Sequence, residues 1–267
     1  MGTKDASKEV WASGDSYEPY VGRWSRLVAQ EFVHWLGLSE GRQWLDVGCG
    51  TGALSQIIFD KLNPKKVQGI DRSEGFVEFA RNQVNDSRVE FEVGDAQALA
   101  VESGVYDAAV SGLVLNFVPR PDQMIAEMMR AVHKGGIVAL YVWDYAGKMQ
   151  LMRHFWNAAA ALDPAAHDLD EGRRFPICNP DSLTELFQNT GLSQVEVRPI
   201  DISTDFKDFD DYWSPFLGGQ APAPSYAMSL SEERRAQLRE RIYNSLPFAL
   251  DGSIPLVARA WAVRGVK

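Results

Sequence analysis

The residues with the clearest chemical potential form a glycine-rich turn. Asp46 lies in a short apolar run, and glycines then stand at every second position, at Gly48, Gly50 and Gly52. Glycine accepts positive φ and carries no Cβ, so a ligand can lie directly against the backbone of such a turn. A segment with helical spacing follows, and the free N–H groups of its first turn add hydrogen-bond donors.

The spacing of these glycines separates two kinds of ligand. A dinucleotide-binding turn has the pattern GxGxxG, whereas this chain has GxGxG. The carboxylate of Asp46 would repel a pyrophosphate, and it would attract an ammonium group or lie near a sulfonium. The turn therefore favours a ligand with a cationic amino acid head over a nicotinamide dinucleotide.

Two further acidic residues follow later predicted strands. Asp71 ends the segment GID about 25 residues after Asp46, where a ribose diol is usually held. Asp95 stands in the segment GDA after a third predicted strand, and its carboxylate can accept from the exocyclic amine of adenine. In open α/β sheets, ligands bind at the carboxyl ends of the strands. Three carboxylates around one glycine turn suit a ligand with an amino acid head, a ribose and an adenine.

Alternating strands and helices must position these residues. Short apolar runs predict strands, and apolar residues three or four positions apart predict amphipathic helices. Ser73 is expected to cap one helix, and Pro121 to open another that ends at Gly135 with His133 in its last turn. This alternation indicates right-handed βαβ units and a parallel sheet with helices on both faces. The predicted strands are 43–47, 66–70, 88–93, 106–111 and 137–142, and helices are also expected at 20–36 and 54–62.

The regular alternation of predicted strands and helices ends after residue 145. Helices are expected at 149–162, 180–190 and 231–246, and strands at 194–202 and 255–263. The rest of 204–253 is expected to be helical or loop-like.

The order of the motifs resembles the class I S-adenosylmethionine-dependent methyltransferases. The segments LDVGCGTG, GIDRS, VGDAQAL, YDAAVSGLVLNFV and RAVHKGGIVALYVWD carry the resemblance, which covers about residues 17–145. The chain is most similar to the small-molecule branch that includes the ubiquinone/menaquinone-biosynthesis type, also described as methyltransferase type 11. The resemblance implies a Rossmann-like, doubly wound, seven-stranded and mostly parallel sheet with an antiparallel last strand and a helical cap from insertions.

The resemblance also implies roles for residues of the turn and the strand ends. Gly48, Cys49, Gly50 and Gly52 would line the methionine part of S-adenosylmethionine, with Asp46 near its amino group. Asp71 would take both ribose hydroxyls. The remaining expected contacts are Arg72 and Ser73 beside the adenine, Asp95 and Ala96 at its edge, Ser111 and Leu113 facing the sulfonium and the acceptor, and Tyr20 and Arg23 on a closing arm. Arg23 is a candidate to pair with the cofactor carboxylate in a bidentate way.

The family's domain plan gives the remaining residues a role in acceptor binding. We expect a flexible leader at 1–16, then a single methyltransferase domain over 17–267, with a helical arm at 17–42 and a cofactor-binding core at 43–145. Inserts at 146–192 and 204–253 would form the acceptor-binding cap. Candidate acceptor contacts are Tyr17, Trp156, Arg173, Trp213 and Tyr226, and His154 is a candidate general base. Core packing of the aromatic residues, a solvated Arg173 and a helix-surface His154 are the alternatives.

Composition limits the other readings. The 27 Lys and Arg residues against 36 Asp and Glu give a net charge of −9, which argues against nucleic-acid binding. Two cysteines exclude a disulfide framework, and no metal-ligand spacing stands out. No apolar run approaches a membrane span, and no signal peptide is visible, so a cytoplasmic monomer or homodimer is expected.

The predicted reaction is an in-line transfer of a methyl group from S-adenosylmethionine to a small molecule, leaving S-adenosylhomocysteine. Whether oxygen, nitrogen or carbon is methylated stays open. Two alternatives are a non-catalytic module that binds the same cofactor and an NAD(P)-dependent oxidoreductase. The GxGxG spacing disfavours the oxidoreductase.

Overall fold

The computed structural model describes residues 22–218 and 221–267, which divide into two compact units. The first, here called the sheet unit, comprises Trp24–Trp143, Ile177–Ile200 and Ala260–Lys267. The second, here called the helical unit, comprises Asp144–Pro176, Asp201–Arg259 and the described residues up to Arg23. The predicted insert 146–192 therefore contributes to both units, because its part from Ile177 onward lies in the sheet unit. The predicted leader lies outside the described residues.

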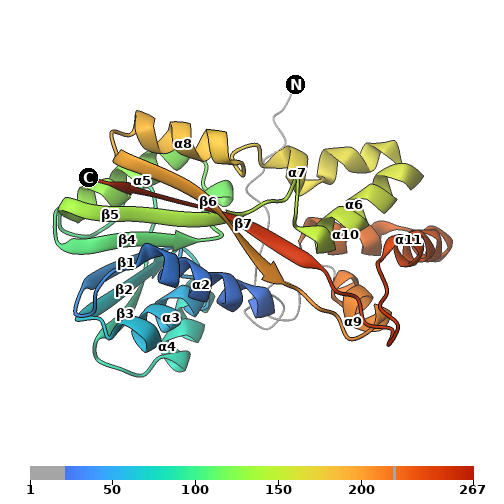
Figure 1. Ribbon diagram of the computed structural model, residues 1–267, viewed down its shortest axis with the longest axis horizontal. Helices are drawn as coiled ribbons and strands as arrows, with labels where there is room; N and C mark the ends of the chain where they lie inside the picture. Colours follow the sequence, from blue (N-terminus) through green and yellow to red (C-terminus); the bar gives the residue numbers. More distant parts are fainter. Residues whose placement is uncertain (1–21, 219–220) are drawn as a thin grey trace. The chain divides into compact units, whose positions relative to one another are not determined.

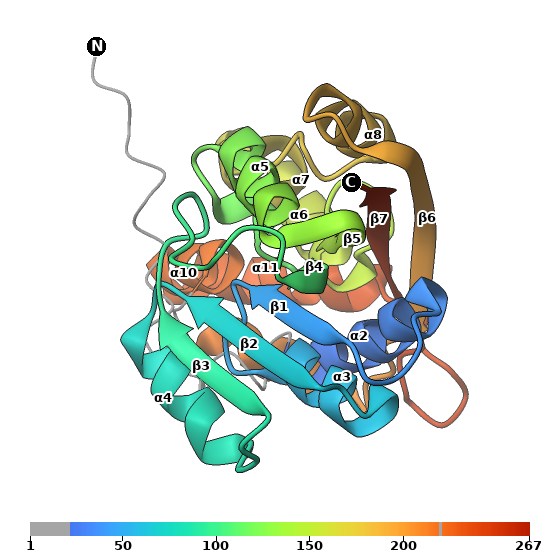
Figure 2. The same ribbon diagram turned by 90° about the vertical axis from the view of Figure 1, so that its left-hand side faces the viewer.

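Seven strands form one sheet in the order β3-β2-β1-β4-β5-β7-β6 (Figures 1 and 2). Neighbouring pairs from β3 to β5 are parallel, and β7 runs antiparallel to β5. This is the predicted fold class. The strands are β1 (Gln43–Val47), β2 (Lys66–Asp71), β3 (Val89–Val93), β4 (Tyr106–Gly112), β5 (Val132–Trp143), β6 (Ser193–Ser203) and β7 (Val257–Val266).

Helices cover both faces of the sheet unit, as the βαβ pattern predicts. Figures 1 and 2 show α2 (Arg23–Leu36), α3 (Ala53–Leu62) and α4 (Glu74–Gln83) on one face, and α5 (Pro121–Ala131) and α8 (Pro180–Asn189) on the other. The central strand β1 is apolar and buried along most of its length, which is typical of a parallel strand covered on both faces.

Local signals in the sequence determine where these helices begin. The Ser73 hydroxyl accepts from Phe76 N and caps α4, and Pro121 stands in the first turn of α5. Asn179 caps α8 by accepting from Ser182 N. A cap needs only a few neighbouring residues, which is why the sequence predicted these starts.

The predicted end of α5 was wrong. The helix ends at Ala131, and β5 begins at Val132 rather than Ile137, so His133 lies in a strand. The buried Val132 pairs with Tyr106 of β4, and the register shifts between Tyr106 and Ala108. Pairing across the sheet thus overrides the helical spacing of the segment, because β-branched valine fits a buried strand well.

The helical unit has an aromatic core of its own. Phe155 stacks on Phe216 at a ring-centre distance of 4.5 Å and meets Trp156 edge-on at 5.1 Å. Its helices are α6 (Gln150–Leu162), α7 (Glu171–Arg174), α9 (Phe209–Trp213), α10 (Pro222–Ser229) and α11 (Glu232–Ser245), with 3-10 turns η3 (Pro164–Leu169) and η4 (Ser214–Leu217).

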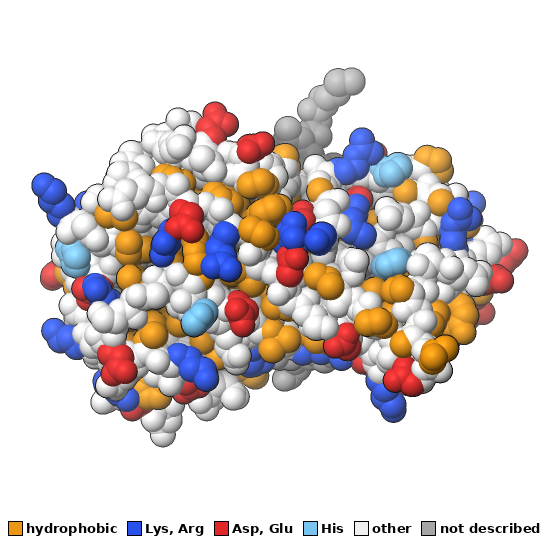
Figure 3. Space-filling view, in the orientation of Figure 1, with side chains coloured by type: hydrophobic (Ala, Val, Ile, Leu, Met, Phe, Trp, Pro, Cys, Tyr) orange, Lys and Arg blue, Asp and Glu red, His pale blue; other side chains and the backbone are white. Residues whose placement is uncertain are grey.

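The surface in view in Figure 3 carries basic and acidic side chains interspersed with one another. Such mixing differs from the clustered Lys and Arg that phosphate backbones require. Among the described helices, none combines the length and apolar character needed to cross a bilayer.

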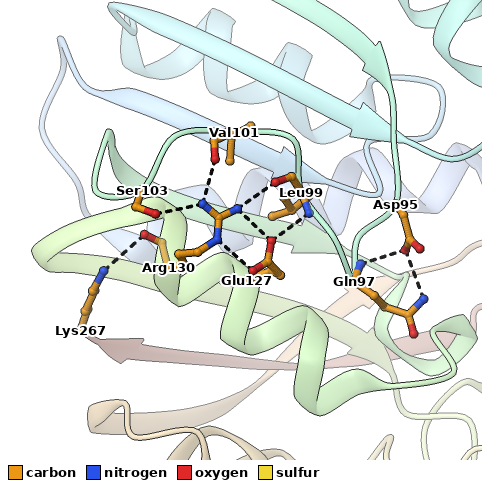
Figure 4. Close-up of polar contacts among 8 residues, drawn as sticks. All are labelled: Asp95, Gln97, Leu99, Val101, Ser103, Glu127, Arg130 and Lys267. Atoms are coloured by element: carbon orange, nitrogen blue, oxygen red, sulfur yellow. Dashed lines mark hydrogen bonds and ion pairs between the residues drawn. The ribbon is translucent and has the colours of Figure 1, made fainter.

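One arginine fixes the long connection between β3 and β4. Arg130 donates to the carbonyl oxygens of Leu99 and Val101, each at 2.8 Å, and also to Ser103 Oγ at 3.0 Å (Figure 4). It pairs with Glu127, whose carboxylate accepts from Leu99 N at 2.9 Å. The contacted residues lie just before β4, so this clamp fixes the part of the connection that leads into the start of β4.

We expect Arg130→Met to lower the free energy of unfolding by about 1–3 kcal/mol, because charge-assisted bonds to two carbonyls would be lost. The measurement is urea denaturation followed by circular dichroism. Arg120→Met is the matched control, since Arg120 pairs with Asp122 on an exposed surface and should change stability by about 0.5 kcal/mol or less. Equal effects of the two variants would contradict the clamp.

Candidate functional site

The glycine turn after β1 has the backbone that the sequence predicts. Gly48, Gly50 and Gly52 have φ of 74°, 53° and 84°. At Gly48 a Cβ would lie 2.6 Å from two side-chain carbons of Val114, whereas a Cβ at Gly50 would have no atom of the described residues within 4 Å. The turn is therefore closed at Gly48 and open at Gly50, so a ligand can approach the backbone there.

Backbone hydrogen bonds fix the turn to the end of β2. Gly48 N and Cys49 N both donate to Ile70 O, at 2.7 and 3.1 Å. The Cys49 side chain is buried against Gly69, and burial raises the pKa of its thiol well above the ordinary value. Cys49 is thus a neutral residue that fills the turn, and its expected contact with the ligand would come from its backbone.

Asp46 is buried at the end of β1, with 1% of its surface exposed. Its Oδ2 accepts from the Ser55 hydroxyl at 2.7 Å, while its Oδ1 has no hydrogen-bond partner within residues 22–218 and 221–267. Burial raises the pKa of Asp46 to about 7, an effect that the Ser55 bond reduces and the nearby Asp71 charge increases. Sequence reasoning missed Ser55, for which the available signal was a polar residue within the apolar face of α3.

Asp71 joins the ends of β1 and β2. Its Oδ2 accepts from Gly50 N and its Oδ1 from Ser73 N, both at 2.9 Å. Burial raises the pKa of its carboxyl, and these two backbone bonds oppose that rise. Arg72 between them is exposed. The structure therefore brings Asp46, Asp71 and the glycine turn together at one sheet edge.

Asp95 has a visible structural role in the turn after β3. Its Oδ1 accepts from Gln97 N at 2.9 Å and Gln97 Nε2 at 3.2 Å, and these bonds lower the pKa of its carboxyl (Figure 4). The side chain is exposed, and Ala96 is half-buried. A turn-capping carboxylate with an exposed surface can still accept from a ligand amine, so the predicted adenine contact stays a prediction.

The end of β4 carries unpartnered polar groups. Ser111 is buried, with 1% of its surface exposed, and its Oγ has no hydrogen-bond partner among the residues described. Leu113 has a left-handed backbone with φ of 63°, which is rare for a residue with a Cβ. Both polar atoms of the Asn116 amide are buried and find no partner in the part of the chain that the structure describes, and sequence reasoning missed this residue.

The predicted arm lies only partly within the described residues. Tyr17 and Tyr20 fall outside them, so their expected contacts stay predictions. Arg23 forms an ion pair with Asp211 at 3.0 Å, and its guanidinium lies 4.8 Å from the centre of the Phe206 ring. Asp211 thus gives Arg23 an acidic partner within the chain, and the expected pairing of Arg23 with the cofactor carboxylate stays a prediction.

The predicted acceptor residues other than Tyr17, together with His154, belong to the helical unit, where most of them contribute to packing. Trp156 is buried and donates its indole N–H to Glu171. Trp213 stacks on Phe209, and Tyr226 lies 6.3 Å from the Phe155 ring. Arg173 is exposed on α7. His154 Nδ1 lies 3.1 Å from Ser245 Oγ, and burial lowers the pKa of its ring.

Residues 45–140 match the family described as a methyltransferase domain. This part of the chain is a methyltransferase domain. It contains the glycine turn, Asp46, Asp71, Asp95 and the end of β4.

Two curated relatives agree with this assignment. Trans-aconitate 2-methyltransferase of Variovorax paradoxus is 28% identical over 163 residues, which are 61% of this chain and 58% of that one. Demethylmenaquinone methyltransferase of Halalkalibacterium halodurans is 26% identical over 182 residues, 61% of this chain and 73% of that one. The match thus spans little more than half of the length of the first relative.

Solved structures share the fold at low sequence identity. Phosphoethanolamine N-methyltransferase 2 of Haemonchus contortus, in complex with S-adenosyl-L-methionine, has a TM-score of 0.62 at 16% identity, covering 100% of this chain and 60% of that one. The [4+2]-cyclase SpnF has a TM-score of 0.53 at 20% identity, covering 98% and 85%. The methyltransferase domain thus has a fold that also occurs in a protein named for another reaction.

The buried Asp46 of the methyltransferase domain should make stability depend on pH. The pKa of Asp46 is higher in the folded chain than the ordinary 3.8. The protonated Asp46 therefore makes its full contribution to the free energy of unfolding below about pH 4, and this contribution is lost as the pH rises through about 7. Asp46→Asn does not ionise, so its free energy of unfolding should rise relative to wild type over this window. The upper bound is about 4 kcal/mol, at about 1.4 kcal/mol per pKa unit.

Urea denaturation at a series of pH values measures this difference. Asp60→Asn is the control, since Asp60 is exposed on the same helix α3 that carries Ser55. Parallel stability curves for wild type and Asp46→Asn between pH 4 and 7 would show that Asp46 is ionised in the folded chain.

Proposed function

We propose that the chain is an S-adenosylmethionine-dependent methyltransferase that acts on a small-molecule acceptor. The observation that carries this proposal is the open backbone at Gly50 beside the buried carboxylate of Asp46 and the half-buried carboxylate of Asp71, at the ends of adjacent strands. The two curated relatives, named for methyl transfer to trans-aconitate and to demethylmenaquinone, support it.

The residues present fit this cofactor. The unpartnered Oδ1 of Asp46 is a buried acceptor, which suits the ammonium group of the methionine part. Each oxygen of Asp71 accepts one backbone N–H and retains capacity for a second bond, which suits the two ribose hydroxyls. Arg72, Ser73, Asp95 and Ala96 are the proposed adenine contacts, and Ser111 and Leu113 lie beside the proposed reaction centre.

The chemistry expected of these residues is mainly positioning. When bound, S-adenosylmethionine supplies a methyl group that a cationic sulfur already activates. The new bond from the acceptor atom to carbon forms as the carbon–sulfur bond breaks, and the bonding electrons remain on sulfur. Holding the acceptor in line and excluding water can contribute on the order of 7–11 kcal/mol. A base is needed only where the acceptor must lose a proton, and His154 is the proposed candidate.

The helical unit is the proposed source of acceptor specificity. Trp156, Arg173, Trp213 and Tyr226 are its candidate contacts, because inserted segments on a fixed scaffold commonly set specificity. The cytoplasmic location, the small-molecule partner and the monomeric or dimeric state belong to the same proposal.

A second candidate is a module of this fold that binds the cofactor without transferring methyl groups. The similarity to the cyclase favours testing it, because a fold does not determine a reaction. A nicotinamide-dependent oxidoreductase is disfavoured by the GxGxG spacing and by the buried Asp46 beside the turn.

We expect S-adenosylhomocysteine to bind the wild-type chain, and Asp71→Asn to raise its dissociation constant about 10- to 100-fold, since two bonds to a charged acceptor weaken. Isothermal titration calorimetry measures this, with Asp60→Asn as the control. NAD should not bind. Binding of NAD without S-adenosylhomocysteine would sink the proposal.

We also expect transfer of a labelled methyl group from S-adenosylmethionine to a member of a panel of phenols, acids, amines and carbon acids. Mass spectrometry of the product identifies the methylated atom. Asp71→Asn should lower the rate at limiting cofactor, whereas Asp60→Asn should not. Tight cofactor binding with no transfer to any panel member would favour the non-catalytic module.

A further inference from the structure

Three polar side chains, at the end of β1, in β4 and in the 3-10 turn that follows β4, have buried atoms without a hydrogen-bond partner among the described residues. They are Oδ1 of Asp46, Oγ of Ser111, and both Oδ1 and Nδ2 of Asn116. Burying a polar group without a hydrogen bond costs free energy, so such groups concentrate where a ligand completes them. The proposed function uses Asp46 for the cofactor ammonium, whereas nothing so far uses the Asn116 amide.

The backbone holds Asn116 close to the glycine turn. Strands β1 and β4 are paired in parallel, with Asp46 opposite Val110, so both end at the same edge. The Val114 side chain packs against Gly48, and Leu115, which is 1% exposed, anchors the 3-10 turn that carries Asn116.

The conformation leading into this turn is strained and fixed. Leu113 adopts φ of 63°, and its N–H donates to Tyr141 O at 2.8 Å. A left-handed residue with a Cβ persists only where its surroundings hold it, and such residues cluster at ligand sites. Asn116 is thus presented by a rigid segment rather than by a loose loop.

We propose that Asn116 positions the methyl acceptor, and that this acceptor carries a hydroxyl and a second oxygen on neighbouring carbons. This inference rests on the proposed function and deepens it. An amide presents a donor and an acceptor side by side. The Asn116 Oδ1 accepts a hydrogen bond from the acceptor's hydroxyl group, and a lone pair on the hydroxyl oxygen stays free to attack. The Asn116 Nδ2 donates a hydrogen bond to the acceptor's neighbouring oxygen. Ser111 Oγ supplies a further hydrogen bond to this pair of acceptor oxygens.

Methyl transfer then occurs to the hydroxyl oxygen. The O–CH₃ bond forms, the carbon–sulfur bond breaks with its electron pair left on sulfur, and the hydroxyl proton passes to a base, for which His154 is the proposed candidate. Asn116 holds the nucleophile and takes no proton, so it is a positioning residue.

The test observes the Asn116 side-chain amide by NMR in ¹⁵N-labelled full-length chain saturated with S-adenosylhomocysteine. Asn116→Leu assigns the signal pair by its loss. Catechol, with two neighbouring oxygens, should shift this pair, whereas phenol, anisole and benzylamine should shift it at most weakly. Labelled methyl transfer to catechol should fall at least tenfold in kcat/KM in Asn116→Leu and in the isosteric Asn116→Asp.

Measurements of cofactor binding distinguish a failure of the proposed function from a failure of the Asn116 assignment. The dissociation constant of S-adenosylhomocysteine should stay within twofold of wild type in both Asn116 variants and in Asn82→Leu, an exposed control on α4 that should also retain transfer. Because an unpartnered amide is removed, Asn116→Leu should raise the urea midpoint of unfolding. Loss of S-adenosylhomocysteine binding in wild type would overturn the proposed function itself. If S-adenosylhomocysteine binds normally but catechol does not shift the Asn116 amide signals, only the assignment of Asn116 is overturned. The same holds if S-adenosylhomocysteine alone shifts these signals.

Discussion

The carboxylate of Asp71 accepts one backbone N–H from Gly50 and one from Ser73, and the geometry of the site depends on this pair of bonds. The first bond fixes the open part of the glycine turn to the end of β2. The second holds the residue that caps α4. A single side chain therefore sets the positions of a turn, a strand end and a helix start. A neutral or shorter residue would weaken all three links together.

The same arrangement places the half-buried carboxyl group of Asp71 near the buried carboxyl group of Asp46. Burial raises the pKa of both Asp46 and Asp71, and the Asp71 charge adds to the effect at Asp46. Only one of the two has both oxygens hydrogen-bonded within the chain. Ionisation of both carboxyl groups is therefore unfavourable in the folded chain, and a bound cation would make it more favourable. Such perturbed carboxyl groups are typical of sites selected for binding rather than for stability.

The sequence predicted those features that a few neighbouring residues determine. The glycine turn, the cap at Ser73 and the alternation of strands with helices all follow from local chemistry. It did not predict the bond from Ser55 to Asp46, the ion pair of Arg23 with Asp211, or the start of β5 at Val132. Each of these depends on a partner that only the folded chain brings close. Asn116 escaped notice for the same reason, because an asparagine becomes informative only once its amide is seen to be buried.

The contact between Gly48 and Val114 links two positions that lie far apart in the sequence. Val114 can become smaller without conflict, whereas Gly48 cannot become larger, because both its left-handed backbone and the valine methyl groups exclude a Cβ. The contact therefore restricts side-chain size at position 48 much more than at position 114. During divergence of this lineage, position 114 can drift among small and medium residues and thereby reshape the edge of the site, while position 48 stays glycine.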